Sequence, residues 1–362
     1  MTRVADVLVP AGPLRTFAAG VLEGMGATSS AAVEVGRHLV DANLAGHDSH
    51  GILRLPQYVL QMDNGRLDPG AQPAMLKESA SLALFDARRG FGQWSTRRAL
   101  EWCADQAGRQ GIAAAAVRHS THAGRLGDYA ERACERDLVA ILCLGVVGPG
   151  AGLVAPFNGA GRYLGTNPWA VGIPAGERTP LIVDFATSSV AEGKVRLRRS
   201  RGELLPEGVV LASDGTPTTR PEDLYDGGTL TAVGGALAGH KGYGLGLAAA
   251  LLGALCMIDD PDPTPAGTMS VTPPGRPWAG GVFMVVLDPE WFGGAAGYAT
   301  LAAEVLGAAG SSAPVSGVDR VLVPGEPEAL AREVRSREGI PVPEAIWEQL
   351  REVGARFEVA LP

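Results

Sequence analysis

The sequence predicts a globular protein of mixed helices and strands, of the α/β or α+β class, with about two or three lobes. Its 362 residues exceed what one compact core usually holds. They are 46% hydrophobic and include 50 glycines, a composition typical of a turn-rich enzyme. From Gly111 onward, apolar runs suited to buried strands alternate with amphipathic helical segments.

The charge and cysteine patterns argue against several kinds of partner. The formal net charge is −8, and acidic and basic residues are interspersed, with no basic run longer than 196–201. Neither nucleic acid nor an anionic membrane is therefore expected as a partner. The four cysteines lack C-x-x-C spacing and are expected to be small buried residues in a reducing compartment. No signal-peptide core or uninterrupted apolar span is found, so we expect a cytoplasmic protein.

The first hundred residues begin with two expected helices. Pro13 can sit in the first turn of a helix through Leu22, and residues 28–30 offer N-caps for a second helix that runs toward Leu44. Further along we expect turns at 64–65 and 68–70, a short strand at 82–85 and a helix at 92–109.

The most unusual stretch is 41–58, which carries the run Gly-His-Asp-Ser-His-Gly at 46–51. Both glycines of the run are expected to take positive φ, which would end one helix and free a polar segment before the next. Arg54 and Tyr58 then share one helical face. An imidazole beside an arginine suits acid–base chemistry on a carboxylate substrate. The alternative is a pair of capping residues and a buried histidine at a helix junction.

The second half begins with two expected buried strands, 112–117 and 138–147. The helix between them has Leu126, Tyr129 and Ala133 on its inner face, and its outer face is expected to carry Arg125, Asp128, Arg132 and Glu135. The remaining expected elements are strands at 169–173, 181–188 and 282–287, a polar irregular excursion at 196–226, a helix at 239–255, a proline-rich loop at 261–277, a helix at 295–309 and two short C-terminal helices.

Three loops hold the polar residues best suited to catalysis. The first holds Ser49, His50 and Arg54; the second holds His119 and His122; the third holds Asp184 at a strand end. A histidine held by a serine or an aspartate would have a fixed tautomer. As alternatives, Asp184 could be a helix cap and His119 an exposed side chain. A zinc site built from His47, His50, His119 and His122 is a further alternative, without an H-E-x-x-H motif to support it.

Two glycine-containing segments could bind a ligand. The segment 239–242, with Lys241, is expected to open a helix and to suit a phosphate, and 165–168 could present a hydroxyl and an amide. The alternative for both segments is ordinary turn chemistry. The dinucleotide fingerprint G-x-G-x-x-G, the P-loop and the G-x-S-x-G elbow are all missing from the sequence.

The ordered set of motifs resembles the type-2 malate/L-lactate dehydrogenase family, nearest its hydroxycarboxylate dehydrogenase branch. Each motif is weak alone, but their order and spacing cover 14–350. The motifs are 46–51 with Arg54, Pro56 and Tyr58; Ser120-x-His122-x-Gly124; Val154-x-Pro156-Phe157-x-Gly159; 165–168; Asp184-x-Ala186-Thr187-Ser188; Gly193-Lys194; 241–245; and 324–326.

The resemblance implies a non-Rossmann NAD(P)-binding fold of the L-sulfolactate dehydrogenase type, with a mostly antiparallel central sheet and flanking helical lobes. Residues 1–70 would form a helical lobe that carries the Ser-His-Gly motif and packs with 310–362. Residues 71–120 and 280–309 would form a connecting sheet region, and 121–279 the cofactor-binding domain. Members bind NAD or NADP and assemble as homodimers.

Residue roles also follow from the resemblance. His122 matches the acid–base residue of some members, and Ser49, His50 and Asp184 match a relay proposed in an imine-reducing member, beside Arg54. Arg54 and Tyr58 would hold the substrate carboxylate, and Thr166 would line the pocket. The positions that match cofactor contacts are His122, Asp184, Phe185, Ala186, Lys241 and Gly242.

The expected reaction is hydride transfer between nicotinamide and C2 of a 2-hydroxy or 2-oxo carboxylic acid that is malate-like, lactate-like or bulkier. Many members have Phe where this chain has Ala123, which would enlarge the pocket for a substrate bulkier than lactate or malate. Two alternatives use the same residues: reduction of a cyclic or open imine carboxylate, and a catalytically silent cofactor-binding protein.

Overall fold

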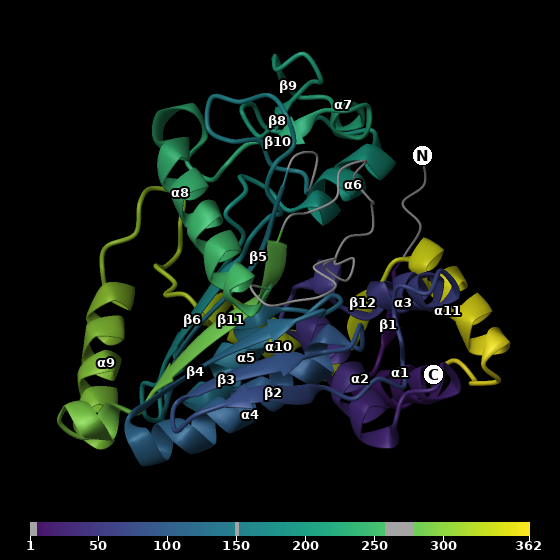
Figure 1. Cartoon of the computed structure of the whole chain (residues 1–362). Helices are drawn as coiled ribbons and strands as arrows, with labels where there is room; N and C mark the ends of the chain where they lie inside the picture. The colour runs from purple at the N-terminus through teal and green to yellow at the C-terminus, as the bar shows by residue number, and fades with distance from the viewer. Residues whose placement is uncertain (1–5, 149–151, 258–278) are drawn as a thin grey trace.

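A seven-stranded sheet lies at the centre of the computed structural model, which describes residues 6–148, 152–257 and 279–362 (Figure 1). Its order is β2-β3-β4-β11-β5-β6-β7, and of these neighbouring pairs only β3–β4 is parallel. The expected mostly antiparallel sheet is confirmed. The strands are β2 (Ala74–Glu78), β3 (Leu82–Asp86), β4 (Ile112–Arg118), β5 (Val139–Val147), β6 (Trp169–Ile173), β7 (Leu181–Phe185) and β11 (Ala279–Leu287).

Helices cover the two faces of this sheet unequally. On one face, α4 (Gly92–Gln110) and α5 (Leu126–Cys134) pack on the sheet around a core that includes Val117, Leu142 and Met284. On the other face, α8 (Gly235–Ala254) packs on β5 and β11. A Cβ on Gly145 of β5 would lie 2.3 Å from the Cα of Ala250, so α8 and β5 meet backbone to backbone. The small-residue composition of α8 permits this contact.

The N-terminal helices pack against the C-terminal end of the chain. Helix α1 (Ala11–Gly24) and helix α2 (Ser29–Leu44) share a core with α11 (Glu344–Arg356), and all three lie on the same side of the molecule in Figure 1. Strand β1 (Val7–Val9) pairs antiparallel with β12 (Ile340–Val342). Helix α2 begins where expected, since the hydroxyl of Thr28 accepts the backbone N–H of Ala31.

A second small sheet of order β10-β8-β9 lies at the top of Figure 1, near α6 and α7. Its strands are β8 (Val210–Leu211), β9 (Pro217–Thr218) and β10 (Thr229–Leu230). The remaining elements are α3 (Leu55–Asp63), α6 (Glu192–Arg201), α7 (Pro221–Tyr225), α9 (Ala295–Gly310), α10 (Glu326–Glu338) and the 3-10 turns η1 (Asp48–His50), η2 (Ile52–Arg54), η3 (Leu255–Met257) and η4 (Pro289–Phe292).

Three expectations about these elements were wrong. The region 196–226 is not wholly irregular, because it contains most of α6, all of α7 and two short strands. Helix α8 does not open at 239–242; it begins after Gly234, whose φ of +99° turns the chain into it. On α5 and just before it, Asp128 and Arg125 are 5% and 2% exposed, because each pairs with an opposite charge in the interior. The expected proline-rich loop at 261–277 lies outside the described residues.

The four cysteines occupy buried positions, as expected from the sequence. Burial raises the pKa of the Cys103, Cys134 and Cys143 thiols. Across the described residues, no helix is both long and apolar enough to span a bilayer.

Candidate active site

Two of the three predicted catalytic loops meet at one cavity, about 110 Å³ in volume. It lies where the 46–51 run, the loop after β4, strand β5 and the turn before β6 come together. Its lining consists of His50, His122, Ala123, Gly124, Leu126, Leu144, Val146 and residues 165–168. The structure therefore brings His50, His122 and Thr166 to a single space.

The 46–51 run is shaped by a residue that the sequence did not single out, Asn43. Gly46 has a φ of +83° and ends α2 as expected. Gly51 does not: its φ is −89°, and a Cβ there would lie 2.2 Å from Oδ1 of Asn43. That oxygen accepts the backbone N–H of Ile52 at 2.8 Å. Gly51 is thus required for close packing rather than for an unusual backbone angle.

His50 is held from one side by a serine and stacks on the second histidine. Ser49 Oγ lies 2.9 Å from its Nδ1, and its ring centroid is 5.5 Å from that of His122. Burial, with the positive charge of Arg54 next, lowers the pKa of His50 from 6.5 to about 3. His50 is therefore neutral near pH 7.

His122 is the end of a buried chain of hydrogen bonds. Its Nδ1 lies 2.7 Å from the hydroxyl of Tyr58, and that hydroxyl accepts a hydrogen bond from Nε2 of Gln93 at 2.6 Å. Tyr58 is 1% exposed, so its hydroxyl faces the histidine rather than open solvent. Burial, and then the charge of Arg54, hold the pKa of His122 well below its usual value. Because Nδ1 is engaged, Nε2 is the nitrogen left for a ligand.

Arg54 is not among the residues that line the cavity, and two hydrogen bonds fix its side chain next to the 46–51 run. Its Nε donates to the backbone carbonyl of Ser49 at 2.7 Å, and its Nη1 donates to Oε1 of Gln57 at 2.6 Å. These bonds orient the guanidinium, a group suited to binding a carboxylate in a forked geometry.

The resemblance implied a relay of Asp184 with Ser49 and His50, but in the structure Asp184 has other polar partners. Its Oδ2 accepts the backbone N–H of Gly127 at 2.7 Å and lies 3.7 Å from Nε of Arg125. Burial raises its pKa, while Arg125 opposes that shift. In the described part of the chain it makes no hydrogen bond to Ser49 or His50. Asp184 thus anchors the first turn of α5 below the His122 loop.

The His122 loop is also anchored to α2 through His38, which sequence reasoning missed. The backbone N–H of Arg125 donates to Nε2 of His38 at 2.9 Å, and Nδ1 of His38 lies 3.2 Å from Asp128. Arg37 donates to both oxygens of Asp128, at 2.9 and 2.8 Å. A histidine within a regular helix gives no motif, and its partners lie about ninety positions away, so only the fold reveals this contact.

The turn that carries Thr166 is held by its neighbour. Asn167 accepts the backbone N–H of Val146 at 2.9 Å and donates to the carbonyl of Gly246 at 2.9 Å. Its φ of +36° is rare outside glycine, and these bonds keep it there. The amide that the sequence suggested as a ligand group is thus used to join β5, β6 and α8.

The remaining cofactor candidates flank this region. Phe185 and Ala186 are half-buried at the end of β7. Lys241 is exposed on α8, and Gly242 packs so tightly that a Cβ would lie 2.3 Å from the carbonyl oxygen of Val233.

The four histidines of the zinc alternative have separate partners. His47 pairs with Glu328 and His119 with Asp86, each at 3.0 Å, while His50 and His122 bond Ser49 and Tyr58. The described residues hold one group with metal-ligand spacing, Glu34, His38 and Asp128. Arg37 donates to the carboxylates of Glu34 and Asp128, so a guanidinium already pairs with both acids.

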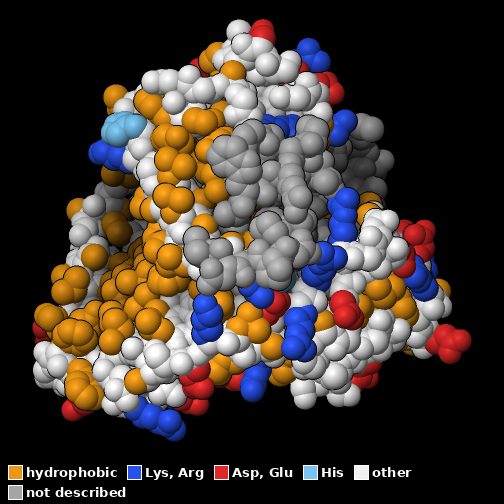
Figure 2. Space-filling view, viewed as in Figure 1, with side chains coloured by type: hydrophobic (Ala, Val, Ile, Leu, Met, Phe, Trp, Pro, Cys, Tyr) orange, Lys and Arg blue, Asp and Glu red, His pale blue; other side chains and the backbone are white. Residues whose placement is uncertain are grey.

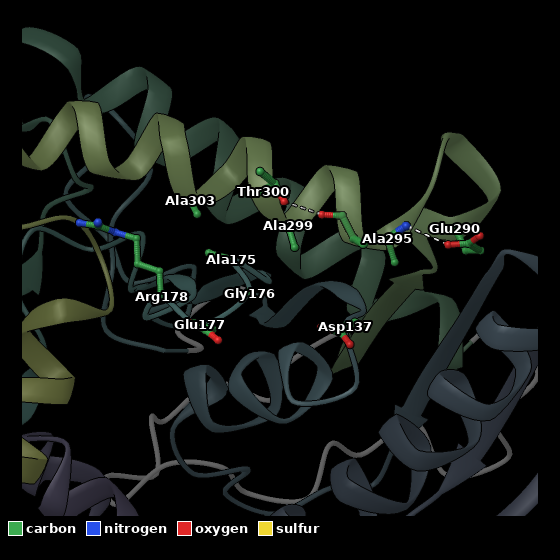
Figure 3. Close-up of a pocket in the computed structure, with 11 residues that line it drawn as sticks. Asp137, Ala175, Gly176, Glu177, Arg178, Glu290, Ala295, Ala299, Thr300 and Ala303 are labelled. Atoms are coloured by element: carbon green, nitrogen blue, oxygen red, sulfur yellow. Dashed lines mark hydrogen bonds between the residues drawn. The ribbon is translucent and has the colours of Figure 1, made fainter.

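A second hollow, about 760 Å³ in volume, lies between α9 and the turn that joins β6 to β7 (Figure 3). Alanines of α9 form one wall, and Arg178 on the opposite side pairs with Glu326. Its lining is Asp137, Ala175, Gly176, Glu177, Arg178, Glu290, Ala295, Ala296, Ala299, Thr300 and Ala303. No histidine, cysteine or tyrosine is in this set, so the smaller histidine cavity is the better candidate for proton transfer.

Comparison with known proteins decides the family. A family model described as malate/L-lactate dehydrogenase matches residues 9–351. The chain belongs to the malate/L-lactate dehydrogenase family. Hydroxycarboxylate dehydrogenase B of Escherichia coli (strain K12) is 33% identical over 340 residues, 93% of this chain and 91% of that protein.

Solved structures of this family agree with the fold. Sulfolactate dehydrogenase from Methanocaldococcus jannaschii has a TM-score of 0.84 at 29% identity, and covers 98% of each chain. Delta1-piperideine-2-carboxylate reductase from Pseudomonas syringae pvar. tomato has a TM-score of 0.80 at 29% identity, over 96% of this chain and 99% of that one. The predicted family, fold and enzyme class are confirmed: this member is a hydroxy-acid oxidoreductase, and its family implies a nicotinamide cofactor.

Proposed function

We propose that this dehydrogenase interconverts a 2-hydroxy and a 2-oxo carboxylic acid with NAD or NADP, and that His122 exchanges the substrate proton. The observation that carries the proposal is the Tyr58–His122 hydrogen bond, which occupies Nδ1 and leaves Nε2 to the cavity. A neutral imidazole near pH 7 is a base for the substrate hydroxyl, and its protonated form is the acid in the reverse direction.

The cavity suits the nicotinamide ring of the cofactor and the C2 end of the substrate. Apart from the two histidines, its lining is mostly small and apolar, which fits a flat nicotinamide ring. When bound, the nicotinamide supplies or accepts the hydride. A volume of about 110 Å³ is too small for a whole dinucleotide. We place the rest of the cofactor in the domain 121–279, against Asp184, Phe185, Ala186, Lys241 and Gly242.

Arg54 would bind the substrate carboxylate and so orient C2. Its bonds to Ser49 and Gln57 fix the guanidinium beside the histidine pair. Thr166 borders the cavity, where its hydroxyl can contact the substrate. Ala123 in the lining leaves room for a side chain larger than that of lactate. For Tyr58 we propose a role on His122, because its buried hydroxyl already lies between His122 and Gln93.

The test is turnover of NADH and NADPH, tried in parallel, with a panel of 2-oxo acids and cyclic imines of small and large side chain. We expect loss of reduced-nicotinamide absorbance with at least one 2-oxo acid. Turnover with cyclic imines alone would favour the reductase alternative, which the likeness to delta1-piperideine-2-carboxylate reductase supports. Cofactor binding without any turnover would favour a silent binding protein, and no cofactor binding would refute the proposal.

We also propose a homodimer that forms through α8, α9 and the neighbouring sheet. Figure 2 shows apolar side chains gathered over this side of the molecule. On α8, Leu237 and Leu251 are 92% and 65% exposed, and on α9, Leu301 and Val305 are 56% and 58% exposed. A stable soluble monomer seldom exposes so many apolar side chains together. The four cysteines are scattered in the sequence without C-x-x-C spacing, which supports a reducing compartment, and we propose the cytoplasm.

A further inference from the structure

Gln93 reaches the proposed acid–base residue without touching the cavity. It is the second residue of α4, and α4 begins against the His122 loop so closely that a Cβ on Gly92 would lie 2.5 Å from the carbonyl oxygen of His122. Gln93 is fully buried and Tyr58 is 1% exposed. Nε2 of Gln93 donates to the Tyr58 hydroxyl, whereas its Oε1 has no hydrogen-bond partner in the described part of the chain.

The direction of this chain of hydrogen bonds determines which nitrogen of His122 carries hydrogen. A hydroxyl has one hydrogen to donate. While Gln93 donates to Tyr58, the hydroxyl hydrogen points to Nδ1 of His122, and the neutral imidazole must carry its own hydrogen on Nε2. In that arrangement His122 presents a donor to the cavity and cannot accept a proton there.

The proposed reaction needs the opposite direction. A base at Nε2 requires the hydrogen on Nδ1, and the protonated imidazolium carries one there too. In both states Nδ1 donates to Tyr58, whose own hydrogen then needs an acceptor. A half-turn of the terminal carboxamide would bring Oε1 of Gln93 to that position, and this torsion is soft.

We propose that Gln93 is a positioning residue for the acid–base step: by presenting Oε1 to Tyr58, it keeps hydrogen on Nδ1 of His122 and leaves Nε2 to exchange the substrate proton. This inference rests on the proposed function, since it assumes that His122 serves as the acid–base. The neutral and protonated states then differ by one proton, which passes between Nε2 and the substrate oxygen.

The test compares two variants with opposite hydrogen-bonding capacity. Gln93→Met keeps the length of the side chain but replaces the amide oxygen by a weakly accepting sulfur, so in the reactive states the Tyr58 hydrogen loses its strong acceptor. We expect kcat to fall about 10- to 100-fold with the cofactor Kd unchanged, and the pH profile of kcat to move to lower pH. Gln93→Glu offers only an acceptor, so its profile is expected to move to higher pH.

The charged and titratable groups that face His122 are Arg54 from η2, His50 from η1, His38 from α2 and Tyr58 from α3, and they are the same in both variants. The matched control is Gln110, which is exposed at the other end of the same helix. Gln110→Met and Gln110→Glu should leave kcat and its pH profile unchanged. In a Tyr58→Phe background, Gln93→Met should have no further effect on kcat.

A readout that does not depend on turnover is the 15N spectrum of labelled histidine. The signal of His122 is assigned as the one that disappears in His122→Asn. With oxamate as a 2-oxo carboxylate probe, we expect hydrogen on Nδ1 in the wild type and on Nε2 in Gln93→Met. Unshifted or same-direction pH profiles in the two variants, or identical His122 spectra, would overturn the role of Gln93. If the wild type turned over no substrate, the proposed function would fail while the spectra still tested Gln93. If Gln93→Glu did not fold, Gln93→Met alone and with Tyr58→Phe would decide.

Discussion

The backbone N–H of Arg125 donates to Nε2 of His38 at 2.9 Å, across 87 positions of sequence. The bond joins the loop that carries His122 to α2. His38 is fully buried, and a Cβ on Gly124 would lie 2.1 Å from its Nε2, so the loop rests directly on the imidazole. The position of the proposed acid–base residue therefore depends on a side chain outside the cavity.

Replacing His38 by Ala should lower both stability and turnover. It removes the acceptor of the Arg125 N–H and leaves Asp128 without one of its neighbours in the interior. Leaving a buried polar group unpaired costs about 1–3 kcal/mol, which urea unfolding would measure. His47→Ala is the control, since His47 pairs with Glu328 at a partly exposed site and should change stability little. Equal unfolding midpoints for the two variants would argue against this anchoring role.

Replacing either His122 or Arg54 by Ala should abolish turnover without unfolding the protein. His122→Ala removes the proton acceptor, and Arg54→Ala removes the group that orients the carboxylate. For Arg54→Ala we expect kcat/KM to fall by at least about 100-fold, the order expected for a lost charge-assisted pair. Circular dichroism would verify the fold, and wild-type rates in either variant would contradict the role of that residue.

His50 should make the protein less stable as the pH falls. Burial and the charge of Arg54 lower its pKa from 6.5 in the unfolded reference to about 3 in the fold. Between these values the unfolded chain binds a proton that the folded chain does not, so the free energy of unfolding decreases as pH drops below 6.5. His50→Asn should show a smaller loss between about pH 7 and about pH 5, measured by urea midpoints. Asp184, whose pKa burial raises, is present in both proteins and cancels in the comparison.

The sequence predicted the large elements and the family motifs well, because both depend on local or ordered signals. The apolar run 112–117 became β4, and the caps at 28–30 became the start of α2. It did not predict the short strands β1 and β12, because each has only three residues and pairs with the other from the opposite end of the chain.

The site residues that lie in sequence motifs were predicted, whereas the residues that hold them in place were missed. Arg125 and Asp128 were expected on the outside of a helix, since a charge pattern cannot show that both would find buried partners. Gln93 and Asn43 carry no motif either, and their roles come only from contacts made on folding. The resemblance implied that Asp184 forms a relay with Ser49 and His50. Its contact with the cofactor remains a prediction.

Gly51→Ala should disrupt the first loop of the site. The new Cβ would lie 2.2 Å from Oδ1 of Asn43, which holds the backbone of Ile52. We expect a loss of about 2 kcal/mol or more in the free energy of unfolding, with reduced turnover. Gly108→Ala is the control: it lies within α4, nothing is within 4 Å of its added Cβ, and it should stabilise by about 0.5–1 kcal/mol. Loss of stability in both variants would show that the crowding at Gly51 is not the cause.

Leu251→Glu should convert the proposed dimer to monomers. Leu251 is 65% exposed on α8, and a charge buried there without a partner would oppose association. Sedimentation equilibrium would measure the mass. Val33→Glu is the matched control, because Val33 is 60% exposed on α2, away from the apolar side, and should leave the mass unchanged. A wild-type monomer would refute the dimer, and a Leu251→Glu protein that remained a dimer would place the interface elsewhere on the surface.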